Sequence, residues 1–349
     1  VVQTLLMFLA LWWLWIFTTW TTNWLDPDRV PVRLMLFALM LGGLMLSSSI
    51  PQAFAERGLA FAVAFAAMQL FRTAFMVFAF ARHGRPDQTR NYARILVWLL
   101  ASTVLWVLGG LAEPAARLGW WTAAVALEYA GPIAYFRVPG LGRSRTESWD
   151  VEGRHIAERC ALFVIIALGE SLLITGATFA DARWTAVTLA AFATALLGSI
   201  AMWWIYFDTG ADRASRRIAR SGDPGRLARL AYTYLHLPIA AGIIVTAVAD
   251  ELVLAHPLHA ENAAIATILG GPALYLLGTT SFKWATNERR LPPLSHLAGL
   301  LLLCALAPFA FAHLLSALAL GAITTAILML VATWETIALR GTGPGRAEN

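Results

Sequence analysis

The sequence has little charge: charged residues make up only 13% of its 349 residues, whereas hydrophobic residues make up 59%. Its mean hydropathy of +0.65 lies outside the range of soluble domains of this size. It also lacks a polar stretch long enough for a separate soluble domain, since apolar runs of about 20 residues follow one another along the whole chain. The scarcity of charge therefore predicts an integral membrane protein.

Cysteine and the common catalytic motifs are also scarce. Cys160 and Cys304 each lie inside an apolar run without a second cysteine nearby, which excludes a disulfide framework and a cysteine zinc site. The patterns GxxxxGK[ST], GxSxG and HExxH do not occur, so an ATP-driven pump or a standard hydrolase is unsupported. We expect no cofactor, and enzymatic activity is the alternative to transport rather than the first expectation.

Apolar runs give the fold class, an all-α polytopic membrane protein. Runs long enough to span a bilayer as helices predict eleven transmembrane segments. They cover Val2–Leu25, Val32–Ile50, Gly58–Ala81, Tyr92–Leu111, Gly119–Phe136, His155–Thr178, Trp184–Phe207, Tyr232–Val253, Asn262–Trp284, Leu297–Leu315 and Ser316–Leu339.

The basic residues predict the orientation of these segments. The net charge of +5 comes from arginines in short loops, where membrane orientation explains them better than nucleic-acid binding, so no nucleic acid is expected as a partner. Alternate loops are rich in arginine, and the positive-inside rule places these loops and the C-terminus in the cytoplasm. The other loops hold only Arg57, Arg117 and Arg183, or none. Val1 then begins outside, within an apolar run, which predicts one preceding helix.

A weak internal repeat agrees with a preceding helix. The segment Trp15–Trp20 (WIFTTW) aligns with Trp204–Thr209 (WIYFDT), and Phe71-Arg72 aligns with Phe282-Lys283. These matches predict two parallel six-helix pseudo-repeats, the first lacking its leading helix. The predicted division is a first membrane repeat at 1–137, a cytoplasmic connection at 138–154, a second repeat at 155–340 and a cytoplasmic tail at 341–349.

Glu170 is the first candidate for an ion or proton site. It lies eleven residues after Arg159, or about 16 Å along a helix, which places it near the middle of the membrane. Acids at this depth are costly and are usually functional. Ser171 and Thr175 follow within about one turn and are supporting candidates. The alternative is a helix-packing hydrogen bond from a protonated acid.

Arg72 and Glu128 are predicted at the same depth, ten and nine residues from the arginines that end their helices. A buried pair, with Gln69 as a supporting residue, would keep both side chains charged, for a structural or a functional reason. Together with Glu170 they leave one carboxylate in excess. Our hypothesis is that Arg72 fixes Glu128 while Glu170 exchanges a proton or a cation.

Other charged residues have simpler interpretations. His155, Glu158 and Arg159 fall within one turn, where they form a local ion pair or, alternatively, a cytoplasmic gate. Lys283 and Glu335 lie near helix ends, so we expect Lys283 to be an interfacial anchor and Glu335 to reach water. His256, His259 and Glu261 surround a proline, so no metal site is expected.

Several short motifs resemble one known family. Glu158-Arg159, Leu162-Phe163 and Gly169-Glu170-Ser171, together with Thr18–Arg29 and Phe71–Met76, are similar to the bacterial low-temperature-requirement A family of multi-spanning membrane proteins. Members usually open with the pattern ELFFDLVF, which is absent here. The resemblance implies a bacterial inner-membrane protein and no particular substrate.

These observations favour a secondary transporter or ion-coupled permease with a mid-membrane carboxylate site. Its expected partners are membrane lipids, a proton or cation and an unknown small-molecule substrate. The alternative is a membrane-embedded enzyme, or a lipid-binding or sensor protein without transport activity. An enzyme would gather its polar groups at one interface, near His155, Glu158 and Arg159, whereas a transporter would gather acids at mid-membrane.

The topology can be tested by cysteine labelling in intact cells. The arginine bias predicts that Asp250–Glu261 faces the periplasm and that Arg213–Arg229 faces the cytoplasm. A cysteine placed at His259 should react with a membrane-impermeant maleimide before the inner membrane is opened. A cysteine in the Arg213–Arg229 loop should react only afterwards, and the reverse pattern would contradict the assignment.

Overall fold

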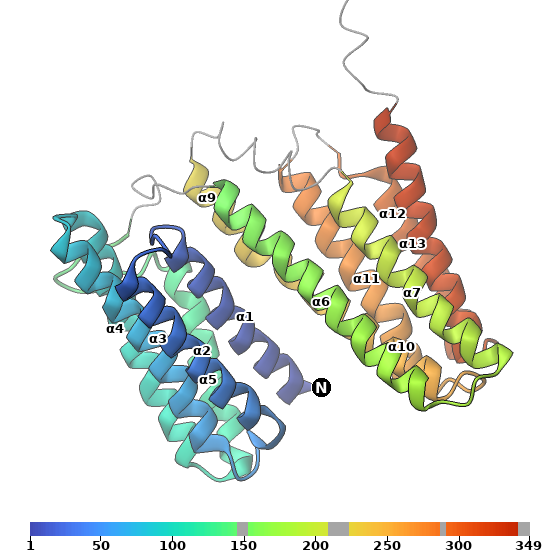
Figure 1. The fold of residues 1–349 in the computed structure, drawn as a ribbon, viewed down its shortest axis with the longest axis horizontal. Coiled ribbons are helices and arrows are strands. Elements are labelled where there is room, and N and C mark those ends of the chain that lie inside the picture. Colours follow the sequence, from blue (N-terminus) through green and yellow to red (C-terminus); the bar gives the residue numbers. More distant parts are fainter. Residues whose placement is uncertain (145–152, 209–222, 287–290, 341–349) are drawn as a thin grey trace, which may run out of the picture. The chain divides into compact units, whose positions relative to one another are not determined.

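A computed structural model describes residues 1–144, 153–208, 223–286 and 291–340 of the chain. The described chain is helical apart from its connections and an isolated β-bridge between Val138 and Gly142, so the all-α prediction is confirmed. Two compact units, Val1–Asp150 (unit 1) and Val151–Asn349 (unit 2), divide the chain, as Figure 1 shows in blue to teal and in green to red. Much of the predicted connection at 138–154 and of the Arg213–Arg229 loop lies outside the described residues, as does the tail at 341–349.

Within residues 1–144, unit 1 consists of five long helices and one short one. α3 packs against α2 and α4, α4 packs against α5, and α1 contacts both α3 and α5. Proline lies at the first position of α4 and of α5, where its missing N–H costs no hydrogen bond. The helices are α1 (Val2–Thr22), α2 (Val30–Ser49), η1 (Ile50–Gln52), α3 (Gly58–Arg82), α4 (Pro86–Leu111) and α5 (Pro114–Ile133).

Unit 2 has six long helices in its described part. α10 packs between α6 and α11, and α13 packs against α7, α11 and α12. A capping box between Thr185 and Thr188 begins α7. The elements are α6 (Gly153–Asp181), α7 (Ala186–Phe207), α9 (Pro224–Ala228), the π-helix η3 (Arg229–Tyr234), α10 (His236–Ala255), α11 (Asn262–Thr286), α12 (Leu294–Phe311) and α13 (Ala317–Arg340).

Each of the eleven predicted segments coincides with a long helix, but the count of eleven spans is not confirmed. Ten helical stretches in the described part are long and apolar enough to cross a membrane, and α5 is not among them. The reason lies in its composition, since α5 contains Arg117, Glu128 and three large aromatic residues of low hydropathy within 20 residues. Both of its charged side chains are buried inside unit 1.

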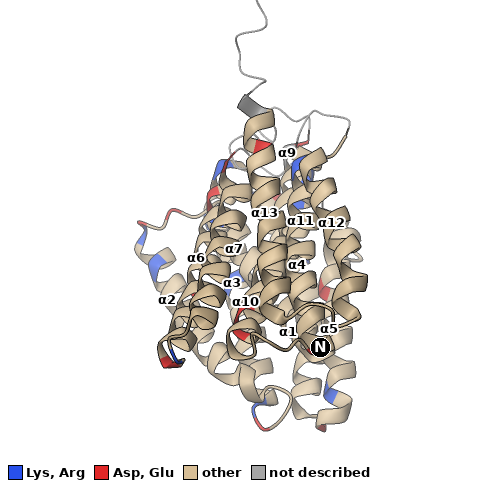
Figure 2. Ribbon diagram, turned by 90° about the vertical axis from the view of Figure 1, so that its right-hand side faces the viewer, with Lys and Arg blue, Asp and Glu red and all other residues tan. Residues whose placement is uncertain are grey.

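The outer surface of the helices is apolar. Leu44, Phe78, Ile166 and Leu173 are among many large hydrophobic side chains that are more than half exposed. Charged residues lie mostly towards helix ends and connections, whereas most of the helix length is uncharged (Figure 2). An apolar surface of this extent is unfavourable in water and matches the hydrocarbon interior of a bilayer.

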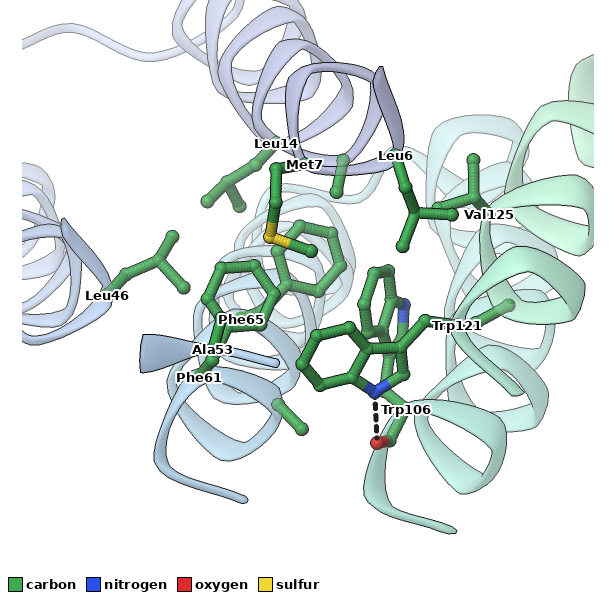
Figure 3. Packing of buried hydrophobic residues seen from close by; sticks show 13 residues of the cluster. Leu6, Met7, Leu14, Leu46, Ala53, Phe61, Phe65, Trp106, Trp121 and Val125 are labelled. Carbon is green, nitrogen blue, oxygen red and sulfur yellow. Dashed lines mark hydrogen bonds between the residues drawn. The ribbon is translucent and has the colours of Figure 1, made fainter. Parts of the chain in front are cut away.

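Aromatic residues form the main core of unit 1. Phe61, Phe65, Trp106 and Trp121 from α3, α4 and α5 are fully buried together beneath Leu6 and Met7 of α1 (Figure 3). The indole N–H of Trp121 donates a hydrogen bond to the Trp106 carbonyl at 3.0 Å. A Cβ atom at Gly109 would lie 2.4 Å from the Trp121 ring, so only glycine allows this close approach of α4 and α5.

Arg117 lies in the first turn of α5 rather than in a loop, and it joins three chain segments. Its guanidinium donates hydrogen bonds to the carbonyls of Ala53 and Ala55 before α3, and to those of Gly109 and Ala112 at the end of α4, at 2.6–3.1 Å. It also lies over the Trp121 ring. Only 5% of Arg117 is exposed, so the guanidinium and the carbonyls it contacts meet inside unit 1 rather than in solvent.

We expect Arg117→Met to lower the free energy of unfolding by about 2–4 kcal/mol, because buried carbonyls would lose charge-assisted hydrogen bonds. Thermal unfolding of the purified protein in detergent would measure this. The matched control is Arg57→Met, since Arg57 is exposed and contacts the chain through the Ser48 carbonyl. Equal effects of the two substitutions would contradict a special role for Arg117.

Candidate functional site

Arg72 is fully buried in unit 1, about midway along α3. Its Nη1 donates to the Leu14 carbonyl at 3.0 Å and to the Thr18 hydroxyl at 2.8 Å, both on α1. Its Nη2 donates to Oε1 of Gln69 at 2.5 Å, and the guanidinium lies 5.7 Å from the centre of the Phe17 ring. A cation at this depth is thus held by neutral acceptors and an aromatic face.

Glu128 is the buried carboxylate of the same unit, with 5% of the residue exposed. Its Oε1 accepts hydrogen bonds from the Ser102 hydroxyl at 2.8 Å and from the Trp106 indole at 2.9 Å, both on α4. Its Oε2 accepts a third from Nε2 of Gln69 at 2.9 Å. Three donors from two neighbouring helices therefore satisfy the acid.

Gln69 links the two charges. Its amide oxygen faces Arg72 while its amide nitrogen faces Glu128, so the side chain joins α3 to α5. The ion pairs found in the described part of unit 1 do not include a direct Arg72–Glu128 contact. The predicted proximity is present, but the amide separates the charges, and Gln69 is the central residue of the network rather than a supporting one.

Unit 2 contains a second buried charge pair, which corrects two sequence interpretations. Lys283 of α11 is 7% exposed and forms an ion pair of 2.6 Å with Glu335 of α13. Its ammonium also donates to the Ile205 carbonyl of α7 at 2.7 Å. Lys283 is therefore not an interfacial anchor, and Glu335 is buried rather than open to water. The imidazole of His296, also fully buried, has Nε2 at 3.9 Å from Glu335.

The two clusters have the same topology. In each unit a cation on one helix (α3 or α11) donates to a backbone carbonyl of a second helix (α1 or α7) and is connected to a carboxylate on a third (α5 or α13). These helices are the ones that the predicted parallel repeat pairs with one another. The alignment of Phe71-Arg72 with Phe282-Lys283 is a sequence signal that could have identified Lys283 as a buried cation, although Lys283 was interpreted as an interfacial anchor.

Glu170 belongs to unit 2 and has a different environment. It lies on an exposed face of α6, and the described part of the chain offers it no hydrogen bond or ion pair. Ser171 and Thr175 lie on the buried face instead, where the Thr175 hydroxyl donates to the Ser171 carbonyl at 2.9 Å. The structure therefore brings Gln69, Arg72 and Glu128 together in unit 1 and leaves Glu170 outside that network.

The cytoplasmic gate candidates lie at the start of α6. Glu158 pairs with Arg154 at 2.8 Å rather than with Arg159, and both side chains of the pair are more than half exposed. Arg159 is exposed as well, and His155 is half-buried. A local ion pair was predicted here, and its partner is one turn earlier than expected. An exposed pair of this kind contributes about 0.3–0.5 kcal/mol.

A π-helix precedes α10 and positions a buried contact between Tyr206 and His236 that was not predicted from the sequence. Nδ1 of His236 lies 2.9 Å from the Ala231 carbonyl, so this nitrogen carries the proton. Nε2 then accepts from the Tyr206 hydroxyl at 2.8 Å. The described residues, which include His256, His259 and Glu261, contain no group of three or more His, Cys, Asp and Glu that could hold a metal ion.

Together, the apolar surface, the membrane-length helices and the charges satisfied inside each unit define a multi-pass integral membrane protein. The family model of the bacterial low temperature requirement A protein (LtrA) matches residues 1–333, so the chain belongs to the LtrA family. It is 43% identical over 341 residues to the uncharacterized protein RA0937 of Rhizobium meliloti (strain 1021). The aligned region covers 97% of this chain and 82% of the relative. No solved structure matches.

We expect double-mutant cycles to distinguish the direct pair from the amide-linked one. Lys283→Met and Glu335→Gln should show a larger coupling energy than Arg72→Met and Glu128→Gln, because Gln69 separates the second pair; such couplings range over about 0.5–3 kcal/mol. Unfolding in mixed micelles would give the free energies. Coupling of Arg72 to Glu128 that survives Gln69→Leu unchanged would contradict the linking role of Gln69.

Proposed function

We propose that this protein is a secondary transporter or ion-coupled permease of the bacterial inner membrane, with its C-terminus in the cytoplasm. The observation that supports the proposal most directly is a difference between three acids. Glu128 and Glu335 each have a buried cation connected to them, whereas Glu170 has no counter-charge in the described part of the chain.

The position of Glu170 makes this difference functional. It lies within the apolar stretch of a 29-residue helix, and its neighbours Ile166 and Leu173 are exposed, large and hydrophobic. A charged side chain near the centre of a membrane helix costs about 2.5–3.5 kcal/mol on insertion scales. An acid without a counter-charge at this depth avoids the cost by holding a proton or a cation, and it can exchange one for the other when water reaches it.

The buried networks then have a supporting role in the proposed mechanism. Arg72, through Gln69, positions Glu128 and joins α1, α3 and α5 into one body. Lys283 does the same for α7, α11 and α13. Helix groups stiffened in this way suit alternating access, in which Glu170 is exposed to one face of the membrane at a time.

A membrane enzyme is the second candidate, and the geometry favours it less. Such an enzyme would need polar side chains converging at one interface, which the sequence placed near His155, Glu158 and Arg159. There Glu158 forms an exposed pair with Arg154, and Arg159 is itself exposed, so these side chains do not enclose a substrate site. A lipid-binding or sensor protein would not require an uncompensated acid.

The decisive experiment measures proton flux in reconstituted vesicles. With a potassium diffusion potential and an entrapped pH-sensitive dye, the wild-type protein should dissipate the potential through proton movement. Glu170→Gln, which mimics the protonated acid, should reduce this flux at least tenfold while thermal unfolding stays close to that of the wild type. Glu170→Asp should retain part of the flux.

The matched control is Glu251→Gln, since Glu251 is an exposed acid near the end of α10 in the same unit. This variant should keep wild-type flux. Full flux in Glu170→Gln, or equal losses in both variants, would contradict the proposed role of Glu170.

A further inference from the structure

A pocket of about 590 Å³ opens at the end of the α2–α3 pair, on the side that the arginine bias predicts to be cytoplasmic. It lies between the α1–α2 connection and the last turns of α3. Its walls combine basic residues with aromatic and aliphatic ones, which is the composition of an interfacial site rather than of a protein core. The basic residues are Arg29, Arg82, His83 and Arg85, and the apolar ones include Trp24, Val32, Phe75 and Phe78.

Positive charge at the pocket is only partly neutralised. Asp26 is the one acid in the lining, and it pairs with Arg29 at 3.4 Å. Arg82 and Arg85 are exposed, and neither forms an ion pair or a side-chain hydrogen bond within the described residues. Two guanidinium groups with unused donors therefore flank the same opening.

The backbone at the end of α3 places these two arginines together. Gly84 adopts a left-handed conformation with φ of 65°, and the N–H of Arg85 donates back to the Phe80 carbonyl at 3.0 Å. This is a Schellman turn, in which the residue after the glycine folds back over the last helical turn. Arg85 is thereby returned towards Arg82 instead of continuing away from the helix.

Below the basic opening, the seam between α2 and α3 is apolar. Phe75 and Val32 line the pocket and belong to the small cluster with Met35 and Leu39 that joins the two helices. Further along the same seam an apolar groove of about 800 Å³ is lined by Leu39, Met68 and Phe71 among others. Among the long helices α2 packs mainly against α3, and its outer side, with Phe37, Leu41 and Leu44, is exposed.

We propose that this pocket binds the phosphate group of an anionic phospholipid, with Arg82 and Arg85 as its ligands and an acyl chain along the α2–α3 seam. Guanidinium groups bind phosphate oxygens through paired N–H donors. Basic pockets between membrane helices on the cytoplasmic side are suited to acidic lipid headgroups. Trp24 lines the same pocket, and indole rings favour the headgroup region of a bilayer.

A lipid fits these observations better than a soluble anion does. A free phosphate would use the arginines but would leave Phe75, Phe78 and the adjoining groove without a function. A second copy of the chain would have to cover an apolar seam whose end carries two unneutralised positive charges on each copy. The lipid satisfies the charge and the apolar wall together.

The test uses the purified full-length chain in neutral detergent and native mass spectrometry with added lipid. Phosphatidylglycerol should bind more tightly than phosphatidylcholine. The double variant R82Q/R85Q should weaken phosphatidylglycerol binding about twenty-five-fold, since each arginine near an anionic headgroup contributes about a factor of five. R90Q, which removes an exposed arginine outside the pocket, should bind like the wild type. Thermal unfolding of each variant checks that the fold is retained.

A second measurement locates the lipid and identifies alternatives. Phosphatidylglycerol with a diazirine in its acyl chain should cross-link to peptides that contain Phe75 and Phe78. Competition by millimolar inorganic phosphate without any acyl cross-link would identify a phosphate site instead. Cross-links elsewhere, a dimer that excludes the lipid, or equal loss of binding in R90Q and R82Q/R85Q would each overturn the proposal.

Discussion

The structure depends on how a carboxylate is kept inside an apolar bundle. Removing one partner from a buried charge costs about 3–5 kcal/mol, so a buried acid constrains everything around it. Glu128 meets this constraint through donors on α3 and α4, and the α3 donor is in turn held by Arg72, which contacts α1. Through these hydrogen bonds, Glu128 of α5 is connected directly to α3 and α4 and indirectly to α1.

Unit 2 meets the same constraint with different residues. A lysine replaces the arginine, contacts the carboxylate directly and needs no amide between them. A shorter cation with a compact charge suits this arrangement, whereas the wide guanidinium of Arg72 distributes its donors over α1 and α3. Each unit thus connects a buried cation to a carboxylate on another helix, but by different contacts.

The sequence predicted the helices well because length and apolarity determine them. It also predicted the burial of Arg72 and Glu128, since depth along a helix follows from residue spacing. It failed where distance to a helix end was taken as access to water: Lys283 lies three residues from the end of α11 and is nevertheless buried, because Glu335 and the Ile205 carbonyl lie beside it. Contacts between helices that are distant in sequence, including the role of Gln69, cannot be read from spacing.

Gln69 also affects what can move through unit 1. The hydrogen bonds run in one direction, from Arg72 to the amide oxygen and from the amide nitrogen to Glu128, and the Trp106 indole at the far end can only donate. A primary amide neither gains nor loses a proton at physiological pH, so a proton cannot pass along this chain as it passes along water or carboxylic acids. The network connects Arg72 to Glu128 through a group that cannot relay a proton, so this route through unit 1 does not conduct protons.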